Sequence, residues 1–484
     1  MKPTDEQIAI VDAVTKTSDN LMIPAYAGTG KSSTLLMLER ALNGAKIIYL
    51  AFNKSAVEKI KYDESADPDE ADKRVLPTTH VKTLNSLGHG VWSATQCKNL
   101  EIDAGKSRKI FRDIAAAAPK LHQDAIWSVY DQTISGVSLA KALGYIPEGK
   151  YPAAKRLITK NSLYAQLDET PDELTADLID EILLRSIKAS FQGLCDFDDQ
   201  VYMPALFGGS FPSYAVVATD EYQDLSPVNH EMLRRLCRKS RHIGVGDQYQ
   251  TIYAFRGAKA GGMSEAIAAY GCATLPLSIS FRCPSEIVKH VHWRVPEFKW
   301  SRTGGLVERS QRLRITDLPE EATFICRNNA PLFRLAMQLL GQGRSITITG
   351  SDIGPRLVRI MRKLGPEDLR RDRLLEAIAE WEADKLEKES KSAPDMAACM
   401  RVFASHGSDL AAAIGYAEWL FKQRGSLTFT TGHKAKGQEW DTVYHLDPWL
   451  VRKHPTDQDM NLDYVISTRA KERLIEINSE DIEP

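Results

Sequence analysis

Two short segments of the sequence hold residues whose types and spacing suit phosphate chemistry. The first is AYAGTGKSST, at 25–34, which follows an apolar run and precedes a helical run. A glycine-rich turn at a helix start presents backbone N–H groups and the positive end of the helix dipole to an anion. Gly28 and Gly30 supply the backbone freedom for a close approach to the phosphates, and Lys31 supplies a positive charge for the β and γ phosphates. Ser32 then supplies a hydroxyl for Mg²⁺.

The second segment is YAVVATDEYQD, at 214–224, an apolar run that ends in two adjacent carboxylates. Asp220 is suited to hold Mg²⁺ through water, and Glu221 is suited to orient and deprotonate an attacking water. Taken alone, the first segment is also compatible with a chance glycine-rich turn and the second with a surface turn. Their joint occurrence favours a site that hydrolyses a nucleoside triphosphate with Mg²⁺.

The elements around these motifs alternate between strand-like and helical patterns. Short apolar runs separated by amphipathic stretches predict βαβ units and a parallel sheet. One set of runs lies at 21–25, 45–52, 214–219, 242–246 and 273–277. A second set lies at 322–327, 345–350, 426–431, 442–447 and 473–478. Because Pro24 has no N–H group, we expect the strand ladder of the first run to end there.

Two blocks with helical periodicity interrupt this alternation, and they divide the chain into four predicted parts. We predict one α/β domain over 1–92 and 192–274, split by a helical insertion over 93–191. A second α/β domain is predicted over 275–350 and 425–484, split by a small helical insertion over 351–424.

Composition sets the outer bounds. A chain of 484 residues is too long for one core, and 43% hydrophobic with 26% charged residues describes an ordinary globular protein. Neither a membrane span nor a secretory signal is recognisable, so we expect a cytoplasmic protein without a membrane partner. The seven cysteines never form C-x-x-C, which favours buried reduced thiols over a zinc site or disulfides. The net charge of −2 argues against binding nucleic acid over the whole protein surface, but it allows a local basic groove that binds nucleic acid.

Further motifs, in a fixed order, resemble those of the UvrD/Rep-like superfamily 1 DNA helicases. TDEYQDLSPVN and VGDQYQTIYAFRGA are similar to motifs II and III of that family. TDEQ, at 4–7, looks like the Q motif, and AYAGTGKSS looks like motif I, in which the family commonly has alanine for the first glycine. Segments similar to motifs Ia, Ib, IV, V and VI lie at 51–56, 82–88, 278–284, 431–441 and 463–474. The compact size resembles phage-encoded members and the F-box DNA helicase branch.

The resemblance implies two RecA-like P-loop NTPase domains that hydrolyse ATP with Mg²⁺ in the cleft between them. Gln250 would sense the γ-phosphate, and Arg282 and Arg469 would be arginine fingers. The residues implied in catalysis are Lys31, Asp220, Glu221, Gln250, Arg282 and Arg469. Those implied in nucleotide binding are Gln7, Ala27, Gly28, Thr29, Gly30, Lys31, Ser32, Ser33, Phe281 and Glu439, with Ser32 and Asp220 at Mg²⁺.

The resemblance also implies a helicase or translocase that moves 3′ to 5′ on single-stranded DNA. Bases would stack on aromatic side chains, although a packed core aromatic is the alternative for the two in motif III. The implied DNA contacts are Phe52, Asn53, Lys54, Asn85, Ser86, Tyr253, Phe255, Arg256 and His433. Basic clusters at 234–241 and 356–363 either meet phosphates or form solvated helix faces. Single-stranded DNA, single-strand/duplex junctions and replication or recombination proteins are the implied partners of a monomer in bacterial or phage-infected cytoplasm.

A second hypothesis is a nucleotide-switched single-stranded DNA-binding or protein-displacing module with little strand separation. The short second insertion favours it, because larger family members carry a duplex-parting hairpin there. Glu221, Gln250 and two candidate fingers argue against it, because a pure switch does not need them. A fused nuclease is not expected, since no acidic domain follows the last motif, and a small-molecule kinase would lack motifs III, V and VI.

Overall fold

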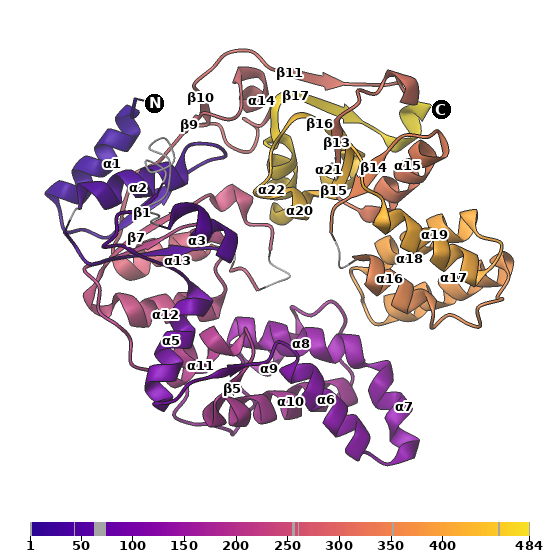
Figure 1. Cartoon of the computed structure of the whole chain (residues 1–484), viewed down its shortest axis with the longest axis horizontal. Helices are drawn as coiled ribbons and strands as arrows, with labels where there is room; N and C mark the ends of the chain where they lie inside the picture. The colour runs from indigo at the N-terminus through magenta and orange to yellow at the C-terminus, as the bar shows by residue number, and fades with distance from the viewer. Residues whose placement is uncertain are drawn as a thin grey trace. The chain divides into compact units, whose positions relative to one another are not determined.

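The computed structural model describes residues 2–42, 44–61, 74–253, 257–259, 261–350, 353–453 and 455–483 (Figure 1). The chain forms two compact units, Met1–Tyr26 with Gly30–Ser278, and Ala27–Thr29 with Ile279–Pro484. Within the described residues, each unit is built on a six-stranded sheet in which every neighbouring pair of strands is parallel. Helices accompany both sheets, which confirms the predicted α/β fold class.

The sheet of the first unit has the strand order β3-β2-β6-β7-β1-β8. Its strands are β1 Leu21–Pro24, β2 Ile47–Ala51, β3 His80–Thr83, β6 Val216–Thr219, β7 Arg241–Gly246 and β8 Ala273–Thr274. The helices of this part are α1 Asp5–Lys16, α2 Lys31–Ala41, α3 Lys54–Ile60, α5 Leu84–Gln96, α11 Asp199–Phe207, α12 Pro227–Leu236 and α13 Gly262–Tyr270. Every residue of β2 and β6 is buried, as expected for central strands of a parallel sheet covered on both faces. This order places the carboxyl ends of β1, β6 and β7 at one edge.

The expectation that the ladder ends at Pro24 is wrong. Pro24 pairs with Gly246 in register, its carbonyl accepts from Leu277 N at 2.8 Å, and Ala25 N donates to the Gly246 carbonyl at 2.8 Å. The missing N–H therefore removes one donor inside a ladder that continues beyond the proline. Strand β3 is an edge strand with the polar sequence HVKT, so it lacked the apolar run that predicted the others.

The first insertion consists of helices joined to a small two-stranded sheet. Its helices are α6 Lys106–Ala117, α7 Lys120–Ser128, α8 Tyr130–Leu143, α9 Lys160–Tyr164 and α10 Glu173–Gln192, and its strands are β4 Glu101–Ile102 and β5 Leu194–Cys195. Leu139, Leu163 and Ile182 belong to the apolar core among these helices. Helix α5 continues to Gln96, so the predicted boundary at residue 92 falls inside a helix.

Two lysines and two aspartates form a buried ionic cluster at the base of this insertion. Lys141 Nζ lies 2.6 Å from Asp196 Oδ2 and 2.8 Å from Asp199 Oδ1. Lys106 Nζ pairs with Asp199 and also donates to the Ser186 carbonyl at 2.9 Å. Burial opposes the ionisation of Asp199, but Lys141 and Lys106 hold its pKa below the usual range. The cluster joins α6, α8 and α10 to the segment that enters α11.

The sheet of the second unit has the strand order β11-β17-β16-β13-β15-β14. Its strands are β11 Leu306–Arg309, β13 Ala322–Cys326, β14 Ile346–Ile348, β15 Leu427–Thr431, β16 Trp440–Leu446 and β17 Ala470–Ile477. Short strands pair outside it, β9 Ile279–Ser280 with β10 Lys299–Trp300 and β12 Leu313–Arg314 with β18 Ile482–Glu483. The helices are α14 Ser285–His290, α15 Asn329–Gly341, α20 Gly432–Ala435, α21 Trp449–Arg452 and α22 Asp457–Ser467. Strand β11, largely exposed at the sheet edge, was not predicted.

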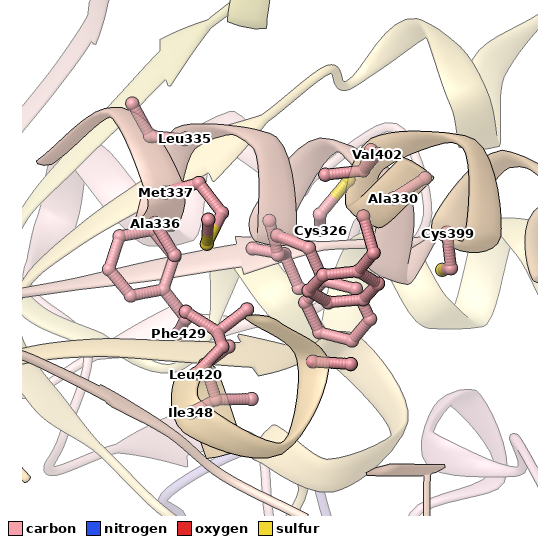
Figure 2. Close-up of a cluster of buried hydrophobic side chains, with 14 of the residues drawn as sticks. Cys326, Ala330, Leu335, Ala336, Met337, Ile348, Cys399, Val402, Leu420 and Phe429 are labelled. Carbon is pink, nitrogen blue, oxygen red and sulfur yellow. The ribbon is translucent and has the colours of Figure 1, made fainter. Parts of the chain in front are cut away.

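Apolar packing joins this sheet to the helices of the second insertion, which are α16 Ile353–Met361, α17 Arg371–Glu387, α18 Ala393–His406 and α19 Leu410–Lys422. Figure 2 shows Phe429 and Ile348 of the sheet with Leu420 of α19 in one buried cluster. The ring of Phe324 stacks on Phe429 with centroids 4.9 Å apart and on Tyr444 with centroids 4.8 Å apart. Stacked aromatic rings add to the free energy gained from burial alone.

The prediction of buried thiols is correct for five of the seven cysteines and wrong for Cys97, which is exposed. Cys97 ends α5 as its C-cap with φ of 52°, in the left-handed region. The left-handed residue that ends a helix is usually glycine and sometimes asparagine. The remaining residue, Cys272, is partly buried, and all seven are free thiols.

His242 makes the stability of the first unit sensitive to acid. It is fully buried in β7, with ring centroids 5.3 Å from Tyr222 and 4.8 Å from Tyr270. Burial lowers its pKa to about 3. An unfolded histidine titrates near pH ~6.5, so the unfolded chain takes up the proton first and the free energy of unfolding falls as pH drops from there towards 3. The slope reaches about 1.4 kcal/mol per pH unit for one such group.

We therefore predict that His242→Phe flattens the fall of the melting temperature between pH 6.5 and 4.5. The measurement is thermal unfolding followed by circular dichroism across that range. His122→Phe, at an exposed position of α7, is the control and should keep the wild-type slope. Equal slopes for His242→Phe and wild type would contradict the prediction.

Candidate nucleotide and DNA sites

The glycine-rich loop has the backbone geometry that a phosphate site requires. Gly28 and Gly30 have φ of 70° and 79°, and Gly30 is the N-cap of α2, which begins at Lys31. Left-handed conformations of this kind are strained for any residue with a Cβ atom. The loop therefore leads directly into a helix N-terminus that carries Lys31, Ser32 and the exposed Ser33.

Asp220 lies at the end of β6 and faces Ser32. Its Oδ2 atom accepts hydrogen bonds from Ser32 Oγ at 3.2 Å and Tyr49 OH at 2.9 Å, and its Oδ1 atom accepts from Glu221 N at 2.8 Å. Burial and the neighbouring Glu221 carboxylate raise the pKa of Asp220, although Lys31 opposes them. Tyr49 was missed by sequence reasoning, because one tyrosine in an apolar strand carries no motif.

This pair of side chains fits Mg²⁺. The ion prefers oxygen ligands and usually binds one or two carboxylates together with water and substrate phosphates. Ser32 and Asp220 supply a hydroxyl and a carboxylate 3.2 Å apart beside the loop. Burial and the Glu221 carboxylate disfavour the ionised form of Asp220 and raise its pKa, and a bound cation would favour that form.

Glu221 sits in a strained conformation within a chain of hydrogen bonds. Its φ is 48°, its carboxylate lies 3.9 Å from Lys31 Nζ, and it accepts from Gln223 Nε2 at 2.6 Å. Strain of this kind persists where surrounding structure enforces it and is common at functional sites. Gln223 Oε1 in turn accepts from Asp247 N at 2.9 Å, and Asp247 accepts from Gln250 Nε2 at 2.6 Å. Motifs II and III are thus connected through Gln223 and Asp247, whose roles the motif patterns did not assign.

Gln7 is engaged within the first unit. Its side chain completes a capping box with Thr4, and its Nε2 atom donates to Thr34 Oγ1 of α2 at 3.0 Å. Only 5% of its surface is exposed. These bonds use one of the two N–H donors and one of the two oxygen lone pairs of the amide.

The loop tip and the implied fingers have defined partners within the second unit. Ala27 N donates to Tyr464 OH at 2.9 Å, and the Gly28 carbonyl accepts from Phe281 N at 2.8 Å. The neighbouring Thr29 is buried. Arg282 forms an ion pair with Glu439, so the implied finger and the implied ribose contact bind each other.

Arg469 is almost entirely buried, with 1% of its surface exposed. Its guanidinium donates to the carbonyls of Val465 at 2.9 Å and Gln438 at 3.2 Å. The side chain therefore has a structural role in the second unit, whatever it contributes to catalysis.

The implied DNA contacts of the first unit lie on helix starts and loops. Phe52 is 48% exposed, Asn53 caps α3 by accepting from Ala56 N at 2.8 Å, and Lys54 is exposed. Asn85 and Ser86 lie in the first turn of α5, and Asn85 Nδ2 donates to the Phe197 carbonyl at 2.6 Å.

Four further implied contacts and one residue missed by sequence reasoning remain. Tyr253 and His433 are partly buried, the latter in α20 of the second unit. Phe255 and Arg256 lie outside the described residues. Phe197 was missed, although 56% of its surface is exposed and Asn85 fixes its backbone. A single phenylalanine between aspartates gives no sequence signal of its own.

The basic cluster at 234–241 is largely occupied by contacts within the protein. Arg234 and Arg235 both bond to Glu231, and Arg241 donates to the Val14 carbonyl at 2.6 Å and the Asp19 carbonyl at 2.7 Å. These bonds favour a structural role over phosphate contacts for this cluster.

Comparison with known proteins assigns the chain to a family. The family model described as the UvrD/REP helicase N-terminal domain matches residues 6–270, and that of the UvrD-like helicase C-terminal domain matches 426–475. F-box DNA helicase protein 1 of Schizosaccharomyces pombe is 24% identical over 536 residues, covering 98% of this chain and 57% of the relative. ATP-dependent DNA helicase UvrD1 of Mycobacterium tuberculosis is 26% identical over 282 residues, covering 51% of this chain and 33% of the relative. The chain spans about half the length of the F-box relatives it matches. It belongs to the UvrD/REP helicase family.

Proposed function

We propose that the protein is an ATP-dependent DNA helicase or translocase that moves on single-stranded DNA, 3′ to 5′, with two RecA-like domains. The observation that carries the proposal is the convergence of Lys31, Ser32, Asp220 and Glu221 at the carboxyl ends of parallel strands. Ligands of open α/β sheets bind at such an edge. We propose the four-part domain division predicted from the sequence, although its first boundary lies within α5.

In the proposed reaction, Lys31 neutralises the β and γ phosphates and Glu221 accepts a proton from the attacking water. Mg²⁺, held by Ser32 and through water by Asp220, would neutralise charge on the phosphates. The hydrogen bond from Gln223 fixes the Glu221 carboxylate. Further hydrogen bonds through Asp247 connect Gln223 to Gln250, the proposed sensor of the γ-phosphate. We propose that Arg282 and Arg469 supply positive charge as the bond breaks, and that both domains contribute to one ATP site.

We propose that single-stranded DNA binds the surface that contains Phe52 and Phe197. Both rings are exposed, and the Asn85 side chain holds the backbone beside the second. Base stacking on an aromatic ring contributes about 1–3 kcal/mol per base.

We therefore predict that Phe197→Ala weakens binding of an unlabelled oligothymidylate about ten-fold or more. Fluorescence anisotropy with a labelled competitor measures the change at fixed salt. Leu121→Ala removes an even more exposed apolar side chain from α7 and should leave binding unchanged. An unaltered affinity in Phe197→Ala would exclude this ring from the DNA surface.

The alternative function is a nucleotide-switched binding or protein-displacing module with little strand separation. The second insertion favours it, because its elements over residues 353–422 are four helices and the described residues there contain no hairpin. Translocation without efficient unwinding would follow if no other element parts the duplex.

The deciding experiment is steady-state ATP hydrolysis with and without single-stranded DNA, followed by unwinding assays of both polarities. Strong stimulation by DNA supports a motor. An ATP hydrolysis rate that DNA does not change, or tight DNA binding without hydrolysis, would favour the nucleotide-switched module instead. Unwinding of substrates with only a 5′ tail would overturn the proposed direction.

The proposed partners are single-strand/duplex junctions and proteins of replication or recombination, met by a monomer in bacterial or phage-infected cytoplasm. F-box DNA helicases of Schizosaccharomyces pombe and Gallus gallus are similar along 98% of this chain, so a eukaryotic setting is equally compatible with the resemblance. Among the helices of the described ranges, none combines the length and apolar character that crossing a membrane requires.

A further inference from the structure

Tyr49 connects the interior of the first sheet to the candidate magnesium site. It lies in the middle of β2, 1% exposed, and its register partner on β6 is Ala218, two residues before Asp220. Its hydroxyl donates to Asp220 Oδ2 at 2.9 Å, and Ser32 Oγ donates to the same oxygen at 3.2 Å. The ring packs in the apolar core on this side of the sheet.

We propose that Tyr49 is a positioning residue that fixes the Asp220 carboxylate in the orientation required to bind magnesium with Ser32. The inference rests on the proposed ATP site. A buried tyrosine hydroxyl needs a hydrogen-bond partner, and here that partner is the Asp220 carboxylate, the proposed magnesium contact, rather than a neutral backbone group. Because Glu221 N holds the Oδ1 atom at 2.8 Å, donors fix both oxygens of the carboxylate.

The hydrogen-bonding capacity of Asp220 leaves room for the ion. Each carboxylate oxygen has about two lone-pair sites. Tyr49 occupies one site on Oδ2, and Ser32 occupies the other only while its hydroxyl points at Asp220. If Ser32 turned towards a bound cation, that site on Asp220 would be available to a water, and Tyr49 would still keep the carboxylate from rotating.

Partners behind a metal ligand typically change metal affinity by about 10–100-fold when they are removed. We therefore expect Tyr49→Phe, which deletes only the hydroxyl, to raise the half-saturating Mg²⁺ concentration about ten-fold. The readout is Mg²⁺-dependent binding of a fluorescent ADP analogue, with Mn²⁺ binding by paramagnetic resonance as the direct check. Binding of the analogue without metal should stay at the wild-type level, because the Tyr49 hydroxyl acts on Asp220, the proposed metal contact.

Two variants separate positioning from packing. Tyr202→Phe removes another buried hydroxyl of the first unit, one that donates to the Tyr145 carbonyl at 2.7 Å, and should titrate like the wild type. Replacement of Tyr49 by 4-aminophenylalanine restores a donor and should recover the wild-type Mg²⁺ dependence. Equal weakening in the phenylalanine and amino variants would assign the effect to packing and overturn the proposal.

A double-mutant cycle tests whether Tyr49 acts through Asp220. The Tyr49→Phe change should have no further effect on metal binding in an Asp220→Asn background. Wild-type Mg²⁺ dependence in Tyr49→Phe, with a large defect in Asp220→Asn, would overturn this inference and leave the ATP site in place. No metal defect in Asp220→Asn would instead remove the proposed site itself.

Discussion

Replacing Glu221 by Gln is expected to lower the DNA-stimulated ATPase rate about 10²–10⁴-fold, the usual contribution of a general base. The amide keeps the size of the side chain and a hydrogen-bonding oxygen for Gln223, but it does not accept a proton from water at neutral pH. Lys31 also loses a carboxylate 3.9 Å from its ammonium group. ATP binding should therefore persist or strengthen while turnover falls.

The measurement is kcat and KM for ATP at saturating single-stranded DNA, with nucleotide affinity determined separately. Glu181→Gln is the matched control, since Glu181 pairs with Arg185 on the insertion surface at 2.6 Å, away from the loop. A Glu221→Gln enzyme that turns over like the wild type would assign water activation to another residue.

Replacing Arg282 by Ala is expected to reduce kcat at least about 10³-fold, the lower range for arginine fingers. Its effect on folding should be small, because the Arg282–Glu439 ion pair is partly exposed, with 20% and 44% of the two side chains accessible. Lys should not rescue the variant, because a compact ammonium does not reproduce the planar fork of a guanidinium. Loss of rate with an unchanged melting temperature would therefore locate the defect in the reaction.

Arg312→Ala is the control for this variant, because Arg312 pairs with Glu483 at 2.6 Å and 63% of the Arg312 side chain is exposed. Full activity in Arg282→Ala would remove this residue from the reaction. Arg469 is a poorer test position, since its buried guanidinium donates to two carbonyls and truncation would remove both hydrogen bonds.

Much of the fold was predictable because buried parallel strands are continuous apolar runs. Strands such as β2, β6 and β13 are buried at every position, and the runs at 45–52, 214–219 and 322–327 predicted them. Two of the edge strands, β3 and β11, escaped prediction for the opposite reason. None of their residues is fully buried and each carries charged residues, so only pairing with a neighbouring strand defines them.

The site shows the same division. Sequence alone reveals residues that lie at fixed spacing within short motifs, namely the loop glycines, Lys31, Ser32, Asp220 and Glu221. Tyr49 contacts Asp220, 171 positions away, and Phe197 contacts Asn85, 112 positions away. Such contacts form only on folding, so the sequence does not indicate them. The implied roles of Gln7, Arg282 and Arg469 stay predictions, since each side chain has partners within the protein.

The buried cluster of Lys106, Lys141, Asp196 and Asp199 has a mechanical consequence for the first insertion. Removing one partner of a buried ion pair costs about 3–5 kcal/mol, so the cluster holds its helices firmly to α11. We therefore expect these helices to move with α11 as one rigid body. Phe197 lies between the two aspartates of the cluster. If a base stacks on Phe197 as proposed, force on the DNA would therefore reach the insertion directly.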